Sequence, residues 1–323
     1  AYLAVGLAAL SSRRVVIGLA GAAAGVLIVW TLPRWDTERL MSGPFVYAAD
    51  YLRRSPAPGA DPERVMRERM AQGEVLFYRE GATANVSVRR QGGILSLRIN
   101  GKTDASTGGD LETQILVGHL PLLLHPAPRQ VLVIGLGSGI TLGAVGRHPV
   151  ERVDLVELSP EVAAAARYFS AHNHRALDDP RVRLVVNDGR NYLLATRRRY
   201  DVITSQPTNP WITGSGNLFT REYFQLCRER LAPGGLAAQW FQLYNVRPED
   251  AWTSIRAFRS VFPHVTAWIT LSGLDLLLIG SDAPAPPGLS RIEEKLARRP
   301  VRDDLARVSL DRASRILGAY LTD

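Results

Sequence analysis

A glycine-rich turn, followed about twenty residues later by a carboxylate, is the part of this chain with the clearest chemical use. The apolar run 131–134 breaks into the turn 135–139, whose glycines let a ligand approach the backbone closely. A second apolar run, 153–156, ends in Glu157, and a carboxylate there is suited to bridge the two hydroxyls of a ribose. The pattern predicts a nucleoside-binding corner, although a glycine turn alone also serves ordinary strand-to-helix connections.

Two further apolar runs end in polar residues. Residues 182–186 lead into Asp188, which can accept a hydrogen bond from an adenine amino group, and residues 200–205 lead into the loop 206–211. Four strands alternating with helical stretches, each with polar residues at its carboxyl end, predict an α/β fold with a doubly wound sheet. The turn lacks the third glycine at dinucleotide spacing, which favours S-adenosylmethionine-type nucleosides over NAD.

The sequence resembles the spermidine synthases (polyamine aminopropyltransferases), particularly the membrane-fused bacterial members. The resemblance runs from about Glu74 to about Ser281. It is carried by residues 100–104, 110–121, the turn at Gly135, Glu157, residues 188–189, 217–224 and 231–235. The last two segments, a Leu-Phe pair opening a helix that ends in Pro-Gly-Gly, are quite specific to the family.

This resemblance implies a class I methyltransferase-like Rossmann domain preceded by a small antiparallel β-domain. It also implies decarboxylated S-adenosylmethionine or S-adenosylmethionine as the donor substrate, with no metal. By similarity, Glu157 holds the ribose, and Asp188 with Gly189 holds the adenine. The backbone of the turn holds the tail of the nucleoside, through Gly135, Gly137, Ser138 and Gly139.

The chain departs from the family's pattern where the family holds cationic amines. An aspartate of the family's turn falls on Ser138, its catalytic aspartate on Gln206, and a second aspartate of that loop on Asn209. The family's tyrosine after the acidic pair falls on Gln114. A glutamine can position an amine through its carbonyl oxygen, but it cannot accept a proton as a general base. Gln206 and Asn209 are nevertheless the residues that we expect at the catalytic positions.

Three further residues are expected on the acceptor side of the site. Asp110, with Glu112, can bind a cationic group, although two loop carboxylates also occur simply as solvated residues. Asp104 belongs to the family-like stretch 100–104. Trp211 can line the acceptor pocket or cover a sulfonium by a cation–π contact, or it can pack against residues 240–241.

The leading functional hypothesis is transfer of an aminopropyl group from decarboxylated S-adenosylmethionine to a small amine acceptor. A first alternative is methyl or aminocarboxypropyl transfer from intact S-adenosylmethionine, because Ser138 removes a negative charge that would repel the donor's carboxylate. A second alternative is a noncatalytic nucleoside- or polyamine-sensing module, because a fold does not by itself imply a function.

Composition frames these hypotheses without deciding between them. The 323 residues are 46% hydrophobic and 22% charged, which suits a globular chain with proper cores. The net charge of +8 comes from scattered arginines, and no helix-turn-helix or aromatic-interleaved basic motif accompanies it, so nucleic acid is not an expected partner. The single cysteine, Cys227, is expected in the core, and a structural role is favoured for His119. A homodimer is left open.

The N-terminal region predicts a membrane segment. Residues 15–32 form an uncharged apolar run of eighteen residues between Arg13-Arg14 and Arg34, which reads as a transmembrane helix rather than a signal peptide because no Ala-x-Ala site follows it. The apolar residues 1–10 suggest an earlier hydrophobic segment of a longer membrane protein. We expect the catalytic domain to face the cytoplasm, because S-adenosylmethionine nucleosides are cytosolic.

These observations predict five segments. They are membrane segments in 1–35, a connector in 36–72, the β-domain in 73–104, the Rossmann-like catalytic domain in 105–285 and a C-terminal helical tail in 286–323. The β-domain is expected because short β-prone runs are separated by glycine-containing turns.

Overall fold

The computed structural model describes residues 12–31, 36–53, 61–212, 214–270 and 272–322. The chain divides into two compact units, Ala1–Glu38 and Arg39–Asp323. The second unit contains both sheets and every residue expected in the nucleoside site. The apolar stretch 1–10 and Leu32 lie outside the described residues.

Helix α2 (Ser12–Thr31) covers nearly all of the segment that was expected to cross a membrane. Across the described ranges, however, no helix combines the length and the apolar character that a membrane crossing needs. The expectation of a transmembrane helix is therefore not supported.

A small antiparallel sheet precedes the main sheet in the second unit, as expected. Its strands lie in sequence order and are β1 (Glu74–Glu80), β2 (Asn85–Gln91), β3 (Ile94–Ile99) and β4 (Lys102–Ser106). Gly92 and Gly93 have positive φ angles of 55° and 82°, which the tight turn between β2 and β3 requires. Helices α3 (Thr37–Ser42), α4 (Pro44–Arg53) and α5 (Pro62–Met70) precede this sheet.

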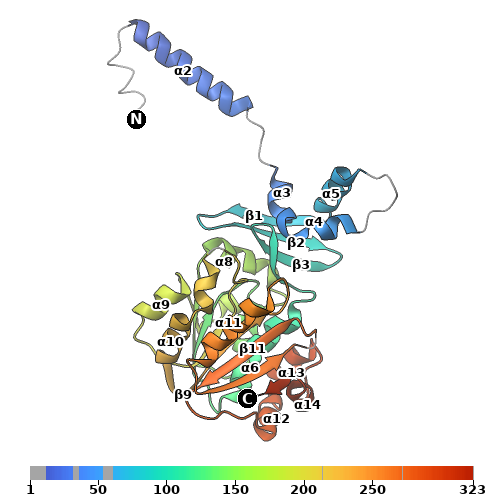
Figure 1. The fold of residues 1–323 in the computed structure, drawn as a ribbon, viewed down its shortest axis with the longest axis vertical. Helices are drawn as coiled ribbons and strands as arrows, with labels where there is room; N and C mark the ends of the chain where they lie inside the picture. Colours follow the sequence, from blue (N-terminus) through green and yellow to red (C-terminus); the bar gives the residue numbers. More distant parts are fainter. Residues whose placement is uncertain (1–11, 32–35, 54–60, 213, 271, 323) are drawn as a thin grey trace. The chain divides into compact units, whose positions relative to one another are not determined.

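The small sheet and helix α5 are joined by a buried arginine. The guanidinium of Arg89 donates to the backbone oxygens of Met70, at 2.7 Å, and Gln72, at 3.1 Å. Met70 is the last residue of α5 and Gln72 follows it, in a region where helix carbonyls lack partners within the helix. Figure 1 shows this sheet with α4 and α5 at one end of the second unit.

The main sheet has eight strands in the order β12-β10-β11-β9-β8-β5-β6-β7. The strands β7, β6, β5, β8 and β9 run parallel, whereas β11, β10 and β12 continue the sheet antiparallel. Their bounds are β5 (Gln130–Ile134), β6 (Arg152–Glu157), β7 (Val182–Val186), β8 (Tyr200–Ser205), β9 (Leu231–Gln242), β10 (His264–Ile269), β11 (Asp275–Ser281) and β12 (Tyr320–Thr322). The run 131–134 is buried on both faces, which explains why this central strand is continuously apolar.

Helices cover both faces of the main sheet. One layer contains α6 (Leu111–Leu124), α7 (Ile140–Gly146), α8 (Pro160–Ala166), α12 (Leu289–Leu296), α13 (Arg299–Ala306) and α14 (Ala313–Leu317). The other contains α9 (Gly189–Ala195), α10 (Arg221–Glu229) and α11 (Pro248–Arg259). Cys227 of α10 is buried in the second layer, and burial raises the pKa of its thiol to about 12. The expected Rossmann-like fold is thus observed.

The C-terminal segment, expected as a helical tail, belongs to the core of the main domain. Ile292, Val301, Leu305 and Ile316 are fully buried against α6 and the sheet. The chain then returns to the main sheet through β12, which pairs with β10. The amphipathic sequences of the C-terminal helices predict that one face of each is buried. The short strand β12 has no such local pattern, because it forms by pairing with β10, which is distant in the sequence.

Candidate nucleoside and acceptor site

The glycine turn joins β5 to α7 in a conformation that only glycine adopts readily. Gly135, Gly137 and Gly139 have φ angles of 90°, 52° and 79°. A Cβ atom on Gly135 would lie 2.7 Å from the backbone oxygen of Gln206, so this glycine also allows the loop after β8 to approach. The turn therefore brings the ends of β5 and β8 together.

Glu157 is the last residue of β6, and its side chain is hydrogen-bonded to this turn. Its carboxylate accepts a 2.9 Å hydrogen bond from the backbone N–H of Leu136 and another of 2.9 Å from that of Ser159. Burial raises the pKa of Glu157, while these backbone donors act in the opposite sense. The two expected ribose- and tail-binding elements thus meet at one place.

Asp188 and Gly189 lie where β7 meets α9. Asp188 caps the helix by accepting from the backbone N–H of Asn191 at 2.8 Å. A Cβ atom on Gly189 would lie 2.7 Å from Cγ2 of Ile134, so the glycine permits close packing against the end of β5. The structure therefore places Asp188 at the same edge of the sheet as Glu157, next to the end of β5.

Ser138, Gln114 and Gln206 belong to one hydrogen-bonded chain. The Ser138 hydroxyl donates to Oε1 of Gln114, whose Nε2 donates to the backbone oxygens of Ser106, at 2.8 Å, and Asp110, at 2.9 Å. The hydroxyl of Thr141 links this group to Gln206, because it lies 3.0 Å from the backbone oxygen of Gln114 and 2.7 Å from Oε1 of Gln206. The hydroxyl has a single proton, so it can donate to only one of these two oxygens at a time.

Asp104 and Trp211 are brought together by a residue that the sequence did not single out. Lys102 is buried, and its ammonium lies 3.6 Å from Oδ1 of Asp104 and 5.8 Å from the centroid of the Trp211 ring. Asp104 also accepts from the Thr208 hydroxyl. A cation of the protein itself thus lies over Trp211, in the arrangement that was expected for a sulfonium.

Asp110 precedes the first turn of α6. Burial raises the pKa of its carboxyl, and the nearby Asp104 adds to that effect, while Ser106 and Lys102 oppose it. Its side chain makes no capping hydrogen bond to the helix. Ser106 is its hydrogen-bond partner instead, and the acceptor-side role of Asp110 stays a prediction.

Asn209 is fully buried, and its amide group forms no hydrogen bond of good geometry, although it acts as a hydrogen-bonding neighbour that lowers the pKa of the Tyr244 hydroxyl. Asn209 faces the hydroxyl of Tyr244, whose pKa is raised chiefly by burial and also by Asp275, Asp110 and Asp104. Asn209 thus lies beside a tyrosine whose hydroxyl is also influenced by these carboxylates.

Asp275, Gln242 and Tyr244 were missed by the sequence analysis. Asp275 accepts from the hydroxyl of Thr113 at 2.6 Å and from the indole N–H of Trp240 at 3.0 Å. The one available signal was a carboxylate at the head of the apolar strand 276–279. Its position beside α6 could not be read from that signal, because Thr113 lies 162 residues away in the chain.

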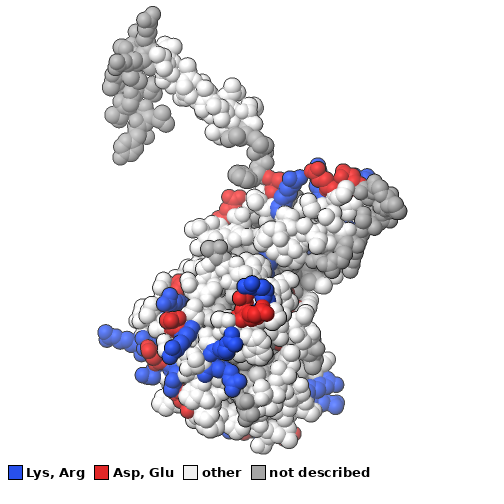
Figure 2. Space-filling model, viewed as in Figure 1, with Lys and Arg blue, Asp and Glu red and all other residues white. Residues whose placement is uncertain are grey.

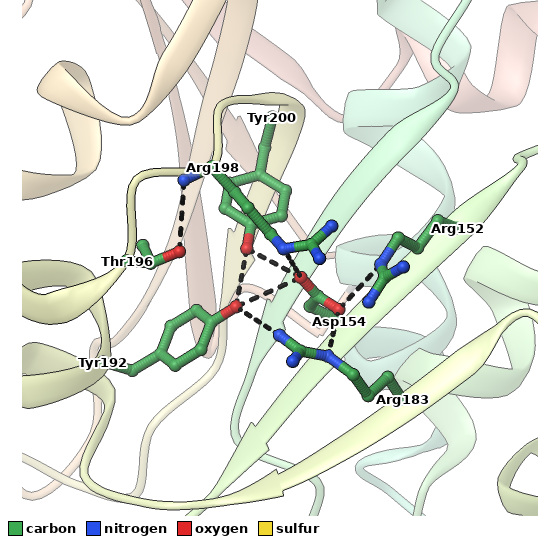
Figure 3. A network of polar contacts seen from close by, with 7 residues as sticks. All are labelled: Arg152, Asp154, Arg183, Tyr192, Thr196, Arg198 and Tyr200. Atoms are coloured by element: carbon green, nitrogen blue, oxygen red, sulfur yellow. Dashed lines mark hydrogen bonds and ion pairs between the residues drawn. The ribbon is translucent and has the colours of Figure 1, made fainter.

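A separate polar network lies around Asp154 of β6, as Figure 3 shows. Its fully buried carboxylate accepts from the hydroxyls of Tyr200, at 2.9 Å, and Tyr192, at 3.1 Å, and from Nε of Arg183, at 2.9 Å. Burial acts to raise the pKa of Asp154, but these donors and Arg152 hold it below its usual value. The network joins β6, β7, α9 and β8, and it is satisfied without a ligand.

Charged side chains elsewhere are interspersed. Figure 2 shows the lysines and arginines of the visible face in separate groups, with acidic residues between several of them. Among the described residues, no group of three or more His, Cys, Asp or Glu side chains is arranged to hold a metal ion.

Comparison with known proteins agrees with this geometry. The family model for the spermine/spermidine synthase domain matches residues 111–272. Spermidine synthase from Dictyostelium discoideum is 33% identical over 157 residues, which cover 47% of this chain and 55% of that protein. Polyamine aminopropyltransferase 1 from Pseudomonas aeruginosa is 38% identical over 146 residues, covering 43% and 50% respectively. The chain thus spans about half the length of the curated relatives it matches.

Solved structures show the same relationship. A spermidine synthase in complex with the transition state analogue AdoDATO aligns with a TM-score of 0.60 and 26% identity, over 65% of this chain and 74% of that chain. Spermidine synthase from Thermotoga maritima aligns with a TM-score of 0.59 and 25% identity, over 65% and 73%. The family model covers half of the sequence, and the chain therefore belongs to the spermine/spermidine synthase family.

Proposed function

We propose that this protein transfers an aminopropyl group from decarboxylated S-adenosylmethionine to a small amine acceptor. The observation that carries the proposal is the hydrogen bond from the backbone N–H of Leu136, in the glycine turn, to the carboxylate of Glu157. Asp188 lies near the same strand ends. A relative with similar architecture was solved with the transition state analogue AdoDATO, which supports a donor of this class.

The reaction that we infer is a single displacement. The amine nitrogen attacks the carbon next to the sulfonium, the C–N bond forms, the C–S bond breaks, and methylthioadenosine leaves with the electron pair. Glu157 binds the ribose, Asp188 and Gly189 the adenine, and the turn 135–139 the tail. A sulfonium is already an activated leaving group, so the protein contributes mainly by positioning the reactants.

The acceptor side of the proposed site contains Gln206, Asn209, Asp110, Asp104, Gln114 and Trp211. Gln206 stands where the family's catalytic aspartate is expected, and the replacement remains our inference from the sequence. Because an amide cannot accept the amine's proton, we propose that proton removal limits the reaction.

One observation favours a second candidate, methyl or aminocarboxypropyl transfer from intact S-adenosylmethionine. Ser138 is neutral and buried, and its hydroxyl is bonded to Gln114. No carboxylate at this position of the turn would repel the carboxylate of the intact donor.

Titration calorimetry and product analysis test the proposal. S-adenosylmethionine, its decarboxylated form and methylthioadenosine should bind, and Glu157→Ala should weaken binding by roughly 1–3 kcal/mol because a buried hydroxyl partner is lost. Methylthioadenosine as product supports aminopropyl or aminocarboxypropyl transfer, and the donor that yields it separates the two. S-adenosylhomocysteine indicates methyl transfer, and binding without product indicates a sensor. If none of these adenosyl compounds binds, the proposal of a nucleoside site is wrong.

We also infer that the N-terminal unit associates with a membrane and that the catalytic domain faces the cytoplasm. The support is the surface of α2, where Ile17, Val26 and Val29 are each at least 65% exposed. Such a helix lowers its free energy by burying these side chains in an apolar environment. A homodimer likewise remains a proposal.

A further inference from the structure

A cleft of about 360 Å³ lies between the end of α7 and the start of α13. Its volume is at the lower end of the roughly 300–1,000 Å³ that small-molecule sites occupy. We propose that this cleft binds a phosphate group of a small ligand, with Arg147 as the principal cation. Such a site needs no transfer reaction and therefore goes beyond the proposed function. The cleft is lined by Arg147, His174, Arg299, Pro300, Asp303 and Asp304.

The cleft and the glycine turn lie at opposite ends of α7. Arg147 is the C-terminal cap of this helix, whose N-terminal cap is Gly139 of the turn. The two ends of a helix of this length are about 10 Å apart, since each residue adds about 1.5 Å. A ligand in the cleft would therefore bind apart from a donor at the turn, and competition experiments can tell the two places apart.

Arg147 is a cation without a partner in the protein. In the part of the chain that the structure describes, its guanidinium forms no hydrogen bond or ion pair, and its Nε is buried. Arg147 helps to lower the pKa of Asp179, but that carboxylate is bound by Arg181 instead, through Nε at 3.0 Å and Nη2 at 2.6 Å. A buried donor without an acceptor is costly, and an oxyanion supplies the missing acceptors.

The two carboxylates that line the cleft already have basic partners. Oδ1 of Asp304 lies 2.7 Å from Nε2 of His174 and accepts from Nη1 of Arg307 at 2.6 Å. Asp303 is paired with Nε of Arg299 at 3.1 Å. Since each carboxylate is matched by an arginine, the unpaired guanidinium leaves the cleft with an excess of positive charge. That excess favours an anion over a cation as the ligand.

Helix α13 adds a second attraction for an anion. Arg299 and Pro300 belong to its first turn, which contains no acidic residue. The N-terminal end of a helix carries a partial positive charge and N–H groups without partners, and both favour phosphate. The side chain of Arg299 is 84% exposed, so it can turn from Asp303 to a ligand without disturbing the core.

A phosphate group matches these features better than a carboxylate. It has three acceptor oxygens and up to two negative charges, so it can contact Arg147, Arg299 and the end of α13 together. A carboxylate has two oxygens and one charge, which a single guanidinium satisfies. We therefore expect phosphate to bind more tightly than acetate.

Isothermal titration calorimetry of the full chain with inorganic phosphate, at constant ionic strength, tests this site. The wild type should bind phosphate, and Arg147→Gln should weaken binding at least tenfold, because an amide replaces neither the charge nor the fork of donors. The matched control is Arg259→Gln on α11. It removes an exposed arginine that forms no ion pair with the described residues, and it should leave the affinity unchanged.

Two substitutions on α13 keep the test decisive if Arg147→Gln disturbs the fold. Arg299→Gln should weaken phosphate binding at least threefold. Asp303→Asn removes a negative charge from the cleft and frees Arg299, so it should strengthen phosphate binding at least threefold. A loss of structure would not produce such a gain of affinity.

Ribose 5-phosphate and glycerol 3-phosphate separate two sources of the phosphate group, a soluble sugar phosphate and a phospholipid headgroup. The source is the one whose probe binds more tightly than inorganic phosphate and loses that advantage in Arg147→Gln. No phosphate binding by the wild type, or wild-type affinity in both Arg147→Gln and Arg299→Gln, would overturn the phosphate site. Displacement of phosphate by methylthioadenosine would do the same, because the ion would then lie at the glycine turn.

Discussion

At the scale of single residues, Gln206 leaves the proposed reaction without a group at that position that can accept the proton of the amine. A free diamine with an amine pKa near that of lysine, about 10.4, is almost wholly protonated at neutral pH, and its reactive fraction is on the order of a thousandth or less. The amide of Gln206 cannot accept a proton, and its oxygen already contacts Thr141.

We therefore expect putrescine to be a poor acceptor for the wild-type chain. Gln206→Asp combined with Asn209→Asp should raise diamine-dependent release of methylthioadenosine, roughly a hundredfold if a general base is restored. Gln91→Glu, which adds a carboxylate at the exposed end of β2 in the small sheet, is the matched control and should have no effect. Efficient turnover of putrescine by the wild type, undiminished in Gln206→Ala, would mean that another carboxylate accepts the proton.

Residues differ in how far the sequence could reveal them. Glu157 and the turn 135–139 follow apolar runs directly, so local patterns predict both their positions and their meeting at the edge of a parallel sheet. Asp275 reaches the site only because β11 returns antiparallel beside β9 and next to α6. No local pattern contains that pairing, so this carboxylate had to be found in the structure.

At the scale of elements, α6 connects the site with the C-terminal helices. Its first turns contribute Thr113 and Gln114, and its middle contributes His119, which is fully buried. His119 lies 2.8 Å from Nε2 of His148 and 3.0 Å from Oδ2 of Asp304 on α13. The structural role favoured for His119 from the sequence agrees with these contacts.

This histidine pair makes stability depend on pH. Burial lowers the pKa of His119 and of His148, so both favour the neutral form in the folded state, whereas the unfolded chain takes up protons near pH 6.5. Because the unfolded state then binds more protons, stability is fully present above about pH 6.5 and declines as the pH falls below it. At Asp304, hydrogen bonds from His119, His174 and Arg307 outweigh the effect of burial and lower the pKa of the carboxyl, which acts in the same direction at more acidic pH.

Urea unfolding measured at pH 7.5 and pH 5.5 checks this expectation. The midpoint of the wild type should be lower at pH 5.5, and His148→Gln, which cannot be protonated there, should lose less of its own midpoint over the same interval. The charged groups that also act on the pair are His174, Arg147, Lys295, Arg298 and Asp304. Equal losses in the wild type and the variant would assign the acid sensitivity to other groups.

Elements of the Rossmann-like domain were predictable for a physical reason. Parallel strands buried on both faces must be apolar, and their helices must follow at short intervals, so both leave a local signal. The sequences of the final helices α12, α13 and α14 are amphipathic, which indicates that one face is buried. They do not indicate which element that face packs against. Their packing against α6 follows from tertiary contacts such as those of Val301 and Ile316.

At the scale of the whole molecule, the proposed site divides between two sets of elements. The nucleoside side is built on β5, β6 and β7, whereas the acceptor side comes from β4, α6, the loop after β8, and the meeting of β9 with β11. The acceptor side thus joins the small sheet to the antiparallel part of the main one. Changes in the acceptor can therefore arise without altering the nucleoside side.

The N-terminal unit poses the last question at this scale, because α2 exposes large apolar side chains whereas the second unit has its own cores. We expect the full chain to remain in the membrane fraction through an alkaline carbonate wash, since burial of α2 in lipid is not reversed by salt or high pH. A chain that starts at Asp36 should be released, apart from adhesion through its arginines that disappears at high ionic strength. Both forms are fractionated and then washed in 1 M salt. At this concentration the Debye length is roughly one third of its value in 0.1 M salt, so attachment through surface charges is weakened and attachment through apolar side chains is not. If the full chain is released as readily as the shortened one, α2 does not hold the protein at a membrane, and its apolar surface needs another partner.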